Sequence, residues 1–303
     1  GKASAHGEPL GEDNIRAMKE FFGWSQEPFQ VPKEVYGHFA AMQSVFEKKE
    51  QEWNALFADW ETAYPELAAQ WKAYHEGSLP EDFAGDPDFW DFQDKTATRS
   101  ASGAVLNRLA GKGLNLFGGS ADLAPSNKTV LSGRGEFGKD NYAGGNVHFG
   151  VREMAMAAAC NGIALYGGLR PFCSTFFVFS DYLKPALRLS ALMKLPVLYI
   201  LTHDSIGVGE DGPTHQPIEQ LAGLRAMPNA MVFRPADGKE TAAGYLAALS
   251  AHGPAVLVLS RQNLPLYEKT GKEAMRGGYI LKDTEGEPDV ILMASGSEVD
   301  VIC

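Results

Sequence analysis

The feature that most limits how this chain can fold is an alternation of short apolar runs with helical segments in its last two thirds. The apolar runs, which we read as strands, are residues 114–117, 197–201, 231–233, 255–259 and 290–293. The helical segments lie near residues 100–110, 153–165, 180–193, 217–226 and 239–251. Such alternation is typical of parallel strands joined by crossover helices. We therefore predict an α/β fold with a mostly parallel sheet and helices on both faces.

The residues before this part follow a different pattern. From 32 to about 76, apolar and aromatic residues recur at helical spacing, which predicts a long helical linker arm that packs on other protein surface. Residues 77–90 are rich in Pro, Gly and Asp and indicate a linker. The chain does not begin with Met, and both ends look cut. We predict the end of an upstream domain with the arm (1–90), a sheet domain (91–270) and the start of a truncated C-terminal domain (271–303).

Composition and charge exclude several classes of function. With 303 residues, 45% of them hydrophobic, the chain can bury a large core, and no apolar run approaches the roughly 18 residues that span a bilayer. The net charge of -11 disfavours nucleic-acid and membrane partners, so a phosphate-bearing ligand would need a local basic pocket. Cys160, Cys173 and Cys303 are too few and too irregular for a disulfide framework or a zinc site, which favours a reduced, cytoplasmic setting.

Residues 203–217 form the richest candidate loop, directly after the apolar run 197–201. The loop contains Gly207-x-Gly209-x-x-Gly212, which matches the dinucleotide-binding pattern. We regard the match as accidental, because the first glycine does not follow the strand closely and neighbouring acidic residues would repel a diphosphate.

A metal site is also disfavoured in this loop, since its histidines and carboxylates lack the spacing of zinc or calcium motifs. In α/β sheets, ligands bind at the loops that follow the carboxyl ends of the strands. The better interpretation is a polar active-site wall in which His203 and His215 exchange protons near pH 7.

Two further candidates remain open on spacing alone. Glu153 begins an apolar helical run, so it is either a helix-capping carboxylate, a partner of Arg152 or a functional group at a helix N-terminus. Phe176, Phe179 and Tyr182 fall three residues apart and would share one face, which is usually core and less often an aromatic slot for a flat heterocycle.

Taken together, six motifs resemble, in order and wording, the pyrimidine-binding domain of the transketolase family. They are Ala-Thr-Arg at 97–99, Gly-Gly-Ser-Ala-Asp-Leu-Ala-Pro-Ser-Asn at 118–127, Gly-Val-Arg-Glu at 150–153, the loop 203–217, Arg-Pro-Ala-Asp at 234–237 and Leu-Ser-Arg-Gln-Asn-Leu-Pro at 259–265. The resemblance covers most of the chain. It implies the thiamine diphosphate-binding fold of the pyrimidine type for residues 91–270.

The same resemblance implies a thiamine diphosphate enzyme that moves a two-carbon ketol unit from a ketose phosphate to an aldose phosphate. Glu153 would bond the ring nitrogen of the aminopyrimidine, and Phe176, Phe179 and Tyr182 would grip that ring. Asp122 resembles the carboxylate near the thiazolium. On the substrate side, Asp211 would read the donor's C2 hydroxyl and His215 would lie near the reacting oxygen atoms. The residues implied to hold the sugar phosphate are Arg99, Ser126, His203 and Arg261.

The resemblance also implies partners that this sequence lacks. The family binds the cofactor's diphosphate through Mg2+ on a Gly-Asp-Gly motif with a downstream Asn, so we expect the Mg2+ ligands on a missing upstream domain. We further expect a homodimer with the cofactor at the subunit interface. Residues 1–303 alone should therefore bind the cofactor weakly and turn over no sugar.

Two alternatives to a transketolase stay open. One is dihydroxyacetone synthase or another thiamine-dependent ketol transferase. The other is a non-catalytic dimerisation module or split subunit.

Overall fold

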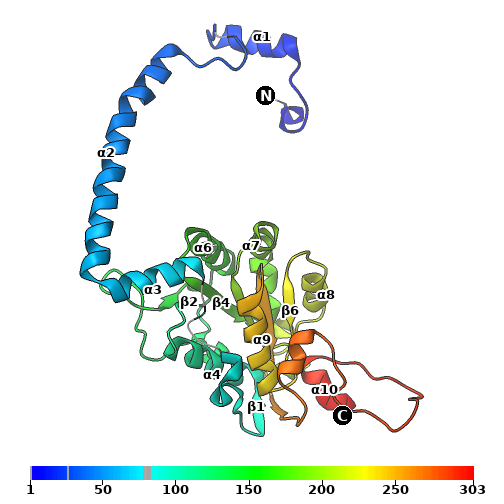
Figure 1. Ribbon diagram of the computed structural model, residues 1–303. Coiled ribbons are helices and arrows are strands. Elements are labelled where there is room, and N and C mark those ends of the chain that lie inside the picture. Colours follow the sequence, from blue (N-terminus) through cyan, green and yellow to red (C-terminus); the bar gives the residue numbers. More distant parts are fainter. Residues whose placement is uncertain (1, 26, 78, 80–82) are drawn as a thin grey trace. The chain divides into compact units, whose positions relative to one another are not determined.

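The computed structural model describes residues 2–25, 27–77, 79 and 83–303 (Figure 1). The chain divides into two compact units, residues 1–69 and 70–303. Each unit is described by itself below. In the described part of the chain, we find no helix with the length and apolar character needed to cross a membrane.

The first unit is helical. It contains α1 (Glu12–Phe21), α2 (Lys33–Ala63) and the beginning of α3 (Pro65–Glu76). Tyr64 caps the C-terminus of α2, and Pro65 begins α3, where a proline is tolerated because the first helical position needs no N–H partner. The predicted helical arm is thus confirmed. Most of its large apolar residues are exposed, however, and none of the 31 residues of α2 is buried.

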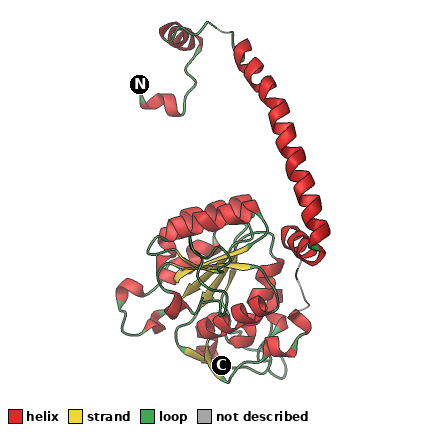
Figure 2. Cartoon of the chain, turned by 90° about the vertical axis from the view of Figure 1, so that its left-hand side faces the viewer, coloured by secondary structure: helices red, strands yellow, loops and turns green. Residues whose placement is uncertain are grey.

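The second unit contains a six-stranded parallel sheet, in the order β3-β2-β4-β5-β7-β6. Its strands are β2 (Leu116–Ser120), β3 (Asn146–His148), β4 (Arg170–Phe176), β5 (Leu198–Thr202), β6 (Met231–Phe233) and β7 (Ala255–Leu259). The longer helices are α4 (Thr98–Gly111), α6 (Glu153–Tyr166), α7 (Ser180–Met193) and α9 (Gly238–Ser250), with shorter α5 (Ala124–Asn127), α8 (Gln220–Arg225) and α10 (Val299–Ile302). Figure 2 shows the strands between layers of helices.

The sheet is covered on both faces, as predicted. Every residue of β5 and β7 is buried, and successive side chains point to opposite faces. Tyr199 and Val258 belong to a core with residues of α6, α7 and α8. Ile200 and Leu257 belong to a second core with residues of α4 and α9. A strand that is buried on both faces reads as a continuous apolar run, which is why β5 and β7 were visible in the sequence.

Two strand predictions need correction. The apolar run 290–293 is not a strand, because no described strand pairs with it, and its residues are exposed. Conversely, β4 lies in the centre of the sheet but was not predicted, because Ser174 and Thr175 interrupt its apolar character. Ser174 is accommodated because its hydroxyl donates to the carbonyl oxygen of Ile200 at 2.6 Å.

A small antiparallel ribbon links the start of α4 to the end of the sheet. It pairs β1 (Lys95–Ala97) with β8 (Asn263–Pro265). The Ser260 backbone N–H donates to Thr98 Oγ1 at 2.7 Å, and the Arg99 backbone N–H donates to the Ser260 carbonyl at 3.3 Å. The ribbon therefore brings Arg99 beside Arg261, although the two residues are far apart in sequence.

Glycines at 118 and 119 allow neighbouring strands to approach β2 closely. A Cβ atom on Gly118 would lie 1.9 Å from the carbonyl oxygen of Phe172, and one on Gly119 would lie 2.0 Å from that of Val147. Any larger residue would push the strands apart. The two glycines thus support the placement of Ser120 and Asp122 at the end of β2.

Candidate active site

The predicted site residues gather at one edge of the sheet, where the parallel strands end. Phe176 ends β4, His203 follows β5, and Arg261 follows β7. Arg99 lies in the first turn of α4, and Glu153 is the first residue of α6. This is the edge at which α/β sheets bind ligands.

His203 is the centre of the cluster. Its side chain is 2% exposed, and its backbone adopts the left-handed conformation with φ of 63°. The imidazole lies against the Phe176 ring, with centroids 3.8 Å apart. Its Nε2 is 3.4 Å from Nη1 of Arg99, and the same Nη1 donates to the Ser126 carbonyl at 2.9 Å. The structure therefore brings four of the predicted residues together.

Electrostatics make this cluster basic but keep its histidine neutral. Burial, followed by the nearby charge of Arg99, lowers the pKa of His203 to about 4, although Asp211 opposes the shift. Burial and the charge of Arg261 lower the pKa of Arg99, which stays protonated because a guanidinium ordinarily titrates above 12. A pKa near 4 disagrees with our expectation that His203 exchanges protons near pH 7.

The aromatic residues form a stepped row beside His203. Phe176 and Phe179 are parallel, with ring centroids 6.0 Å apart and an interplanar angle of 10°. Tyr182 continues the row at 6.1 Å from Phe179, and the His215 ring meets the two phenylalanines edge-on at 5.9 and 5.2 Å. Tyr182 is 64% exposed, so the row is not simply core packing. It leaves apolar ring surface next to the predicted site.

The buried carboxylate of Glu153 has few hydrogen-bond partners. It is 7% exposed, and its one described hydrogen bond is a long one, from Thr175 Oγ1 to Oε1 at 3.4 Å. Arg152 turns away and donates to the Phe149 carbonyl at 3.2 Å. A buried carboxylate is stabilised by further donors, so Glu153 is able to accept a hydrogen bond from a ligand.

The loop 203–217 consists of two short 3-10 turns, Ile206–Val208 and Pro213–His215, rather than a turn that opens a long helix. Gly209 and Gly212 adopt left-handed φ values of 85° and 78°. The next α-helix begins only at Gln220. This geometry differs from a dinucleotide fingerprint, in which the glycine turn leads straight into a helix.

Three predicted residues are less tightly placed. Arg261 Nη2 lies 3.6 Å from Oε1 of the exposed Glu210, and its Nη1 would be 3.2 Å from a Cβ on Gly209. Asp211 is exposed but close enough to act on the charges of Arg99 and His203. Asp122 is exposed at the end of β2 with φ of 61°, and no described side-chain hydrogen bond joins it to the cluster.

Sequence reasoning missed a second charged cluster beside the first. Asp204 Oδ2 accepts from Arg234 Nε at 2.9 Å and lies 2.7 Å from Nη2. Arg234 also donates to the Ser295 carbonyl at 3.2 Å, to Ser297 Oγ at 3.2 Å and to Glu298. Burial raises the pKa of Asp204, against the pull of Arg234. The sequence did carry a signal for this pair: Arg234 directly follows the predicted strand 231–233, and Asp204 lies shortly after the predicted strand 197–201.

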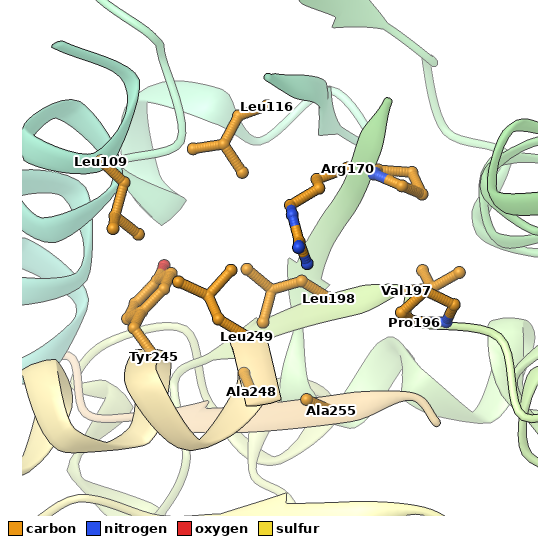
Figure 3. Close-up of a pocket in the computed structure, with 11 residues that line it drawn as sticks. Leu109, Leu116, Arg170, Pro196, Val197, Leu198, Tyr245, Ala248, Leu249 and Ala255 are labelled. Carbon is orange, nitrogen blue, oxygen red and sulfur yellow. The ribbon is translucent and has the colours of Figure 1, made fainter. Parts of the chain in front are cut away.

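The residues that the structure describes contain no group of three or more His, Cys, Asp or Glu side chains able to hold a metal ion. A pocket lies at the opposite edge of the sheet, where the strands begin (Figure 3). It is lined mostly by apolar residues, including Leu109, Leu198 and Tyr245, with Arg170. None of the predicted site residues lines it, so it is separate from the candidate site.

Two family descriptions match the sequence. "Transketolase, pyrimidine binding domain" matches residues 94–266, and "Transketolase, thiamine diphosphate binding domain" matches residues 1–80. Transketolase from Bacillus subtilis (strain 168) is 54% identical over 307 residues, which cover 99% of this chain and 46% of the relative. Transketolase 2 from Escherichia coli (strain K12) is 46% identical over 310 residues, with 99% and 46% coverage. The chain spans about half the length of the curated relatives it matches.

Solved structures give the same result. A complex of transketolase with sedoheptulose-7-phosphate from Pichia stipitis superposes with a TM-score of 0.87 at 41% identity, covering 97% of this chain and 45% of that chain. A transketolase mutant from the same organism, in complex with xylulose-5-phosphate, gives a TM-score of 0.88 at 42% identity with the same coverage. The likeness therefore extends over almost all of this chain.

Proposed function

The chain belongs to the transketolase family, and on that premise we propose that it supplies the pyrimidine side and the sugar-phosphate wall of a ketol transferase site. The reaction is transfer of a two-carbon ketol unit from a ketose phosphate to an aldose phosphate. The observation that carries the proposal is the convergence of two arginines, a buried carboxylate and parallel aromatic rings at one sheet edge.

Thiamine diphosphate fits the apolar half of this site. Glu153 has an unfilled hydrogen-bonding capacity in a buried position, which suits the ring nitrogen of an aminopyrimidine. Phe179 and Tyr182 offer ring surface for a flat heterocycle beside the buried Phe176, and Asp122 supplies a carboxylate at the end of β2. The bound cofactor would supply the carbanion stabilisation that breaking and forming the carbon–carbon bond requires.

The basic half of the site suits the phosphate of a sugar. The charge of Arg261 acts on Arg99 and on His203, and Arg99 contacts His203 directly, which supports a shared basic region. Ser126 lies beside Arg99, because its carbonyl accepts from the guanidinium. Guanidinium groups bind phosphate through paired N–H donors, and His203 lies beside Arg99, where its Nε2 is 3.4 Å from Nη1 and can hold the guanidinium in place.

Asp211 and His215 belong between these two halves in the proposal. His215 lies edge-on to the aromatic row, and Asp211 acts on the charge of Arg99. His215 would accept or donate a proton at the oxygens of the reacting sugar carbons, and Asp211 would accept a hydrogen bond from the donor's C2 hydroxyl. The left-handed glycines Gly209 and Gly212 allow the loop to present both side chains.

The remaining elements of the proposal concern the complete enzyme. We place the Mg2+ ligands outside this chain, the cofactor at the interface of a homodimer and the enzyme in the cytoplasm. Residues 1–90 would end the upstream domain, 91–270 would form the pyrimidine-binding domain and 271–303 would begin a C-terminal domain.

The test is ketol transfer by the enzyme as isolated from its source, so that any partner chain or domain is present. We expect transfer from xylulose 5-phosphate to ribose 5-phosphate that requires both thiamine diphosphate and Mg2+. Glu153→Ala should reduce the rate by about 100-fold or more, the usual scale for losing a proton-transfer partner. Glu153→Gln, which keeps the shape, should also be impaired because it changes the hydrogen-bonding and charge of the group.

Three outcomes would contradict the proposal. Little loss of activity in Glu153→Ala would favour a structural role for the domain. Consumption of formaldehyde in preference to ribose 5-phosphate would indicate a dihydroxyacetone synthase. Robust transfer by a preparation shown by mass spectrometry to contain only residues 1–303 would refute the placement of essential cofactor ligands on another domain.

A further inference from the structure

A chain of buried hydrogen bonds runs from the end of β2 to Arg99. Asn127 Nδ2 donates to Ser120 Oγ at 2.9 Å, and Thr202 Oγ1 donates to Asn127 Oδ1 at 2.7 Å. Thr202 Oγ1 is also 2.8 Å from Nδ1 of His203, whose Nε2 faces Nη1 of Arg99 at 3.4 Å. Ser120, Asn127, Thr202 and His203 are all buried, at 3%, 0%, 0% and 2% exposure.

The positions of the protons in this chain follow from counting donors. The Thr202 hydroxyl has one hydrogen, which it gives to Asn127, so it can only accept from His203. His203 Nδ1 must therefore carry the hydrogen. Because the ring is neutral at pH 7, Nε2 is then a bare acceptor, which is what the Nη1–H of Arg99 requires.

If every hydrogen bond in the series ran in the opposite direction, the contact between His203 and Arg99 would be lost. If the amide of Asn127 were flipped, it would donate to Thr202, and Thr202 would donate to His203 Nδ1. His203 Nε2 would then carry the hydrogen and point it at an N–H of Arg99, so that two donors would face each other at 3.4 Å. Arginine has no acceptor, so this clash cannot be relieved by rotating a proton. Only the Nδ1–H tautomer of His203 satisfies every hydrogen bond in this series.

The same contacts determine which part of Arg99 stays available. Nη1 uses its two hydrogens on the Ser126 carbonyl and on His203 Nε2. Among the described residues, Nη2 makes no hydrogen bond, and Nε is buried without a partner. An unsatisfied buried donor is costly unless a ligand fills it. The His203 contact therefore fixes the guanidinium so that Nη2 is left for an anion, next to the buried and unsatisfied Nε.

We propose that Thr202 and Asn127 are positioning residues, which hold His203 in the Nδ1–H tautomer so that its Nε2 orients Arg99 toward a phosphate group. The two residues touch no ligand themselves. The phosphate part of this inference rests on the proposed function, whereas the tautomer is a property of this chain alone.

The tautomer can be measured directly in the 303-residue chain labelled with 15N-histidine. Two-bond 1H–15N correlation spectra distinguish the protonated from the bare ring nitrogen of each of the seven histidines, and His203→Asn assigns the signal. We expect His203 to carry its hydrogen on Nδ1 at pH 7. An Nε2–H ring in the unaltered protein would overturn the inference without any variant having to fold.

The positioning role is tested with Thr202→Val, which keeps the side-chain shape but removes the hydroxyl. We expect loss of the single Nδ1–H tautomer and a roughly tenfold weaker effect of inorganic phosphate on the Arg99 15Nε signal, the scale of one lost hydrogen bond. Thr202→Ser should restore both readouts.

Thr241→Val is the matched control. Thr241 in α9 is equally buried, and its hydroxyl donates at 2.7 Å to the carbonyl of Asp237, the residue before α9, outside this chain of hydrogen bonds. It should leave the His203 tautomer and the phosphate effect unchanged. An unchanged tautomer in Thr202→Val would refute the positioning role. The expected tautomers together with no phosphate effect on Arg99 would instead count against the proposed phosphate site.

Discussion

Arg99 and Arg234 lie at the same edge of the sheet, and they contact the first and second residues after β5. Arg99 contacts His203, whereas Arg234 contacts Asp204. The two guanidinium groups differ in how fully they are paired. All three nitrogens of Arg234 have partners, which include Asp204, Glu298 and Ser297. Arg99 keeps Nε buried without a partner.

This difference separates a structural arginine from a ligand-binding one. Arg234 joins the loop after β5 to residues 295–298, and its charge is balanced by two carboxylates. Arg99 lies beside a neutral histidine, a carbonyl and the like charge of Arg261, and the exposed Asp211 acts on its charge without a described ion pair. One peptide bond, between His203 and Asp204, divides the two environments. The predictions below test this contrast.

The largest effect is expected at Arg234. Arg234→Leu should lower the free energy of unfolding by about 3–5 kcal/mol, because it leaves the Asp204 carboxylate buried and unpaired. Urea denaturation of the chain measures the change. The double variant Arg234→Leu with Asp204→Leu should recover part of the loss. A loss below about 1 kcal/mol in the single variant would contradict a structural role for this pair.

At Arg99 the expected effect is on binding rather than on stability. Arg99→Leu should raise the KM for a sugar phosphate about 100-fold in the complete enzyme, which corresponds to about 2.7 kcal/mol of lost charged hydrogen bonds. The melting temperature should fall much less than in Arg234→Leu. Arg99→Lys should lie between the two, since it keeps the charge but loses the planar fork. Equal losses of stability in Arg99→Leu and Arg234→Leu would contradict the distinction between a ligand-binding and a structural arginine.

The third prediction concerns pH. Because the pKa of His203 in the folded chain is about 4, below the ordinary value near 6.5, the unfolded chain takes up a proton first as pH falls. The contribution of His203 to stability is therefore complete above pH 7 and about 2 kcal/mol smaller at pH 5. The raised pKa of Asp204 acts in the opposite direction, so the quantity to measure is a difference between variants.

That difference comes from urea denaturation at pH 5 and pH 8 in the unaltered chain and in His203→Asn. Asparagine tolerates the left-handed backbone and has no titrating group. The unaltered chain should lose about 2 kcal/mol more than the variant between these pH values. Parallel curves would show that His203 titrates normally in the folded state.

The smallest effect is expected at Glu210. Glu210 Oε1 lies 3.6 Å from Arg261, but the two side chains are 86% and 33% exposed. Exposed pairs of this kind contribute about 0–1 kcal/mol. Glu210→Gln should therefore change the free energy of unfolding by less than about 0.5 kcal/mol, and less still at high salt. A loss of unfolding free energy as large as that in Arg234→Leu would show that the exposed Glu210–Arg261 pair stabilises the fold as much as the buried Asp204–Arg234 pair.

The sequence predicted best those elements whose buried residues are also apolar. The runs that became β5, β6 and β7 are apolar or nearly so, and the helices between them end near the predicted positions. The central strand β4 escaped notice because buried hydroxyls, such as that of Ser174, take their partner from the next strand. From sequence alone, a polar residue in a strand is expected to be exposed, because its hydrogen-bond partner on the neighbouring strand is not known.

The same limit applies to the site. Spacing identified the carboxyl ends of the strands, and the family resemblance selected Arg99, Phe176, His203 and His215, which the structure brings together. Thr202 and Asn127 were not selected, because their hydrogen bond joins residues 75 positions apart. Arg234 and Asp204 were missed for the same reason, since neither their pairing nor its completeness follows from a local pattern.

The left-handed backbone at His203 has a practical consequence for protein engineering. A randomised library at this position would be filtered first by backbone conformation, because β-branched residues disfavour φ near 63° whereas Gly, Asn and Asp accept it. Enrichment of those three residues would report the shape of the turn and not substrate preference. Fitness scores at 203 therefore become interpretable as ligand recognition only after they are normalised to Gly or Asn, and the same holds at Asp122, where φ is 61°.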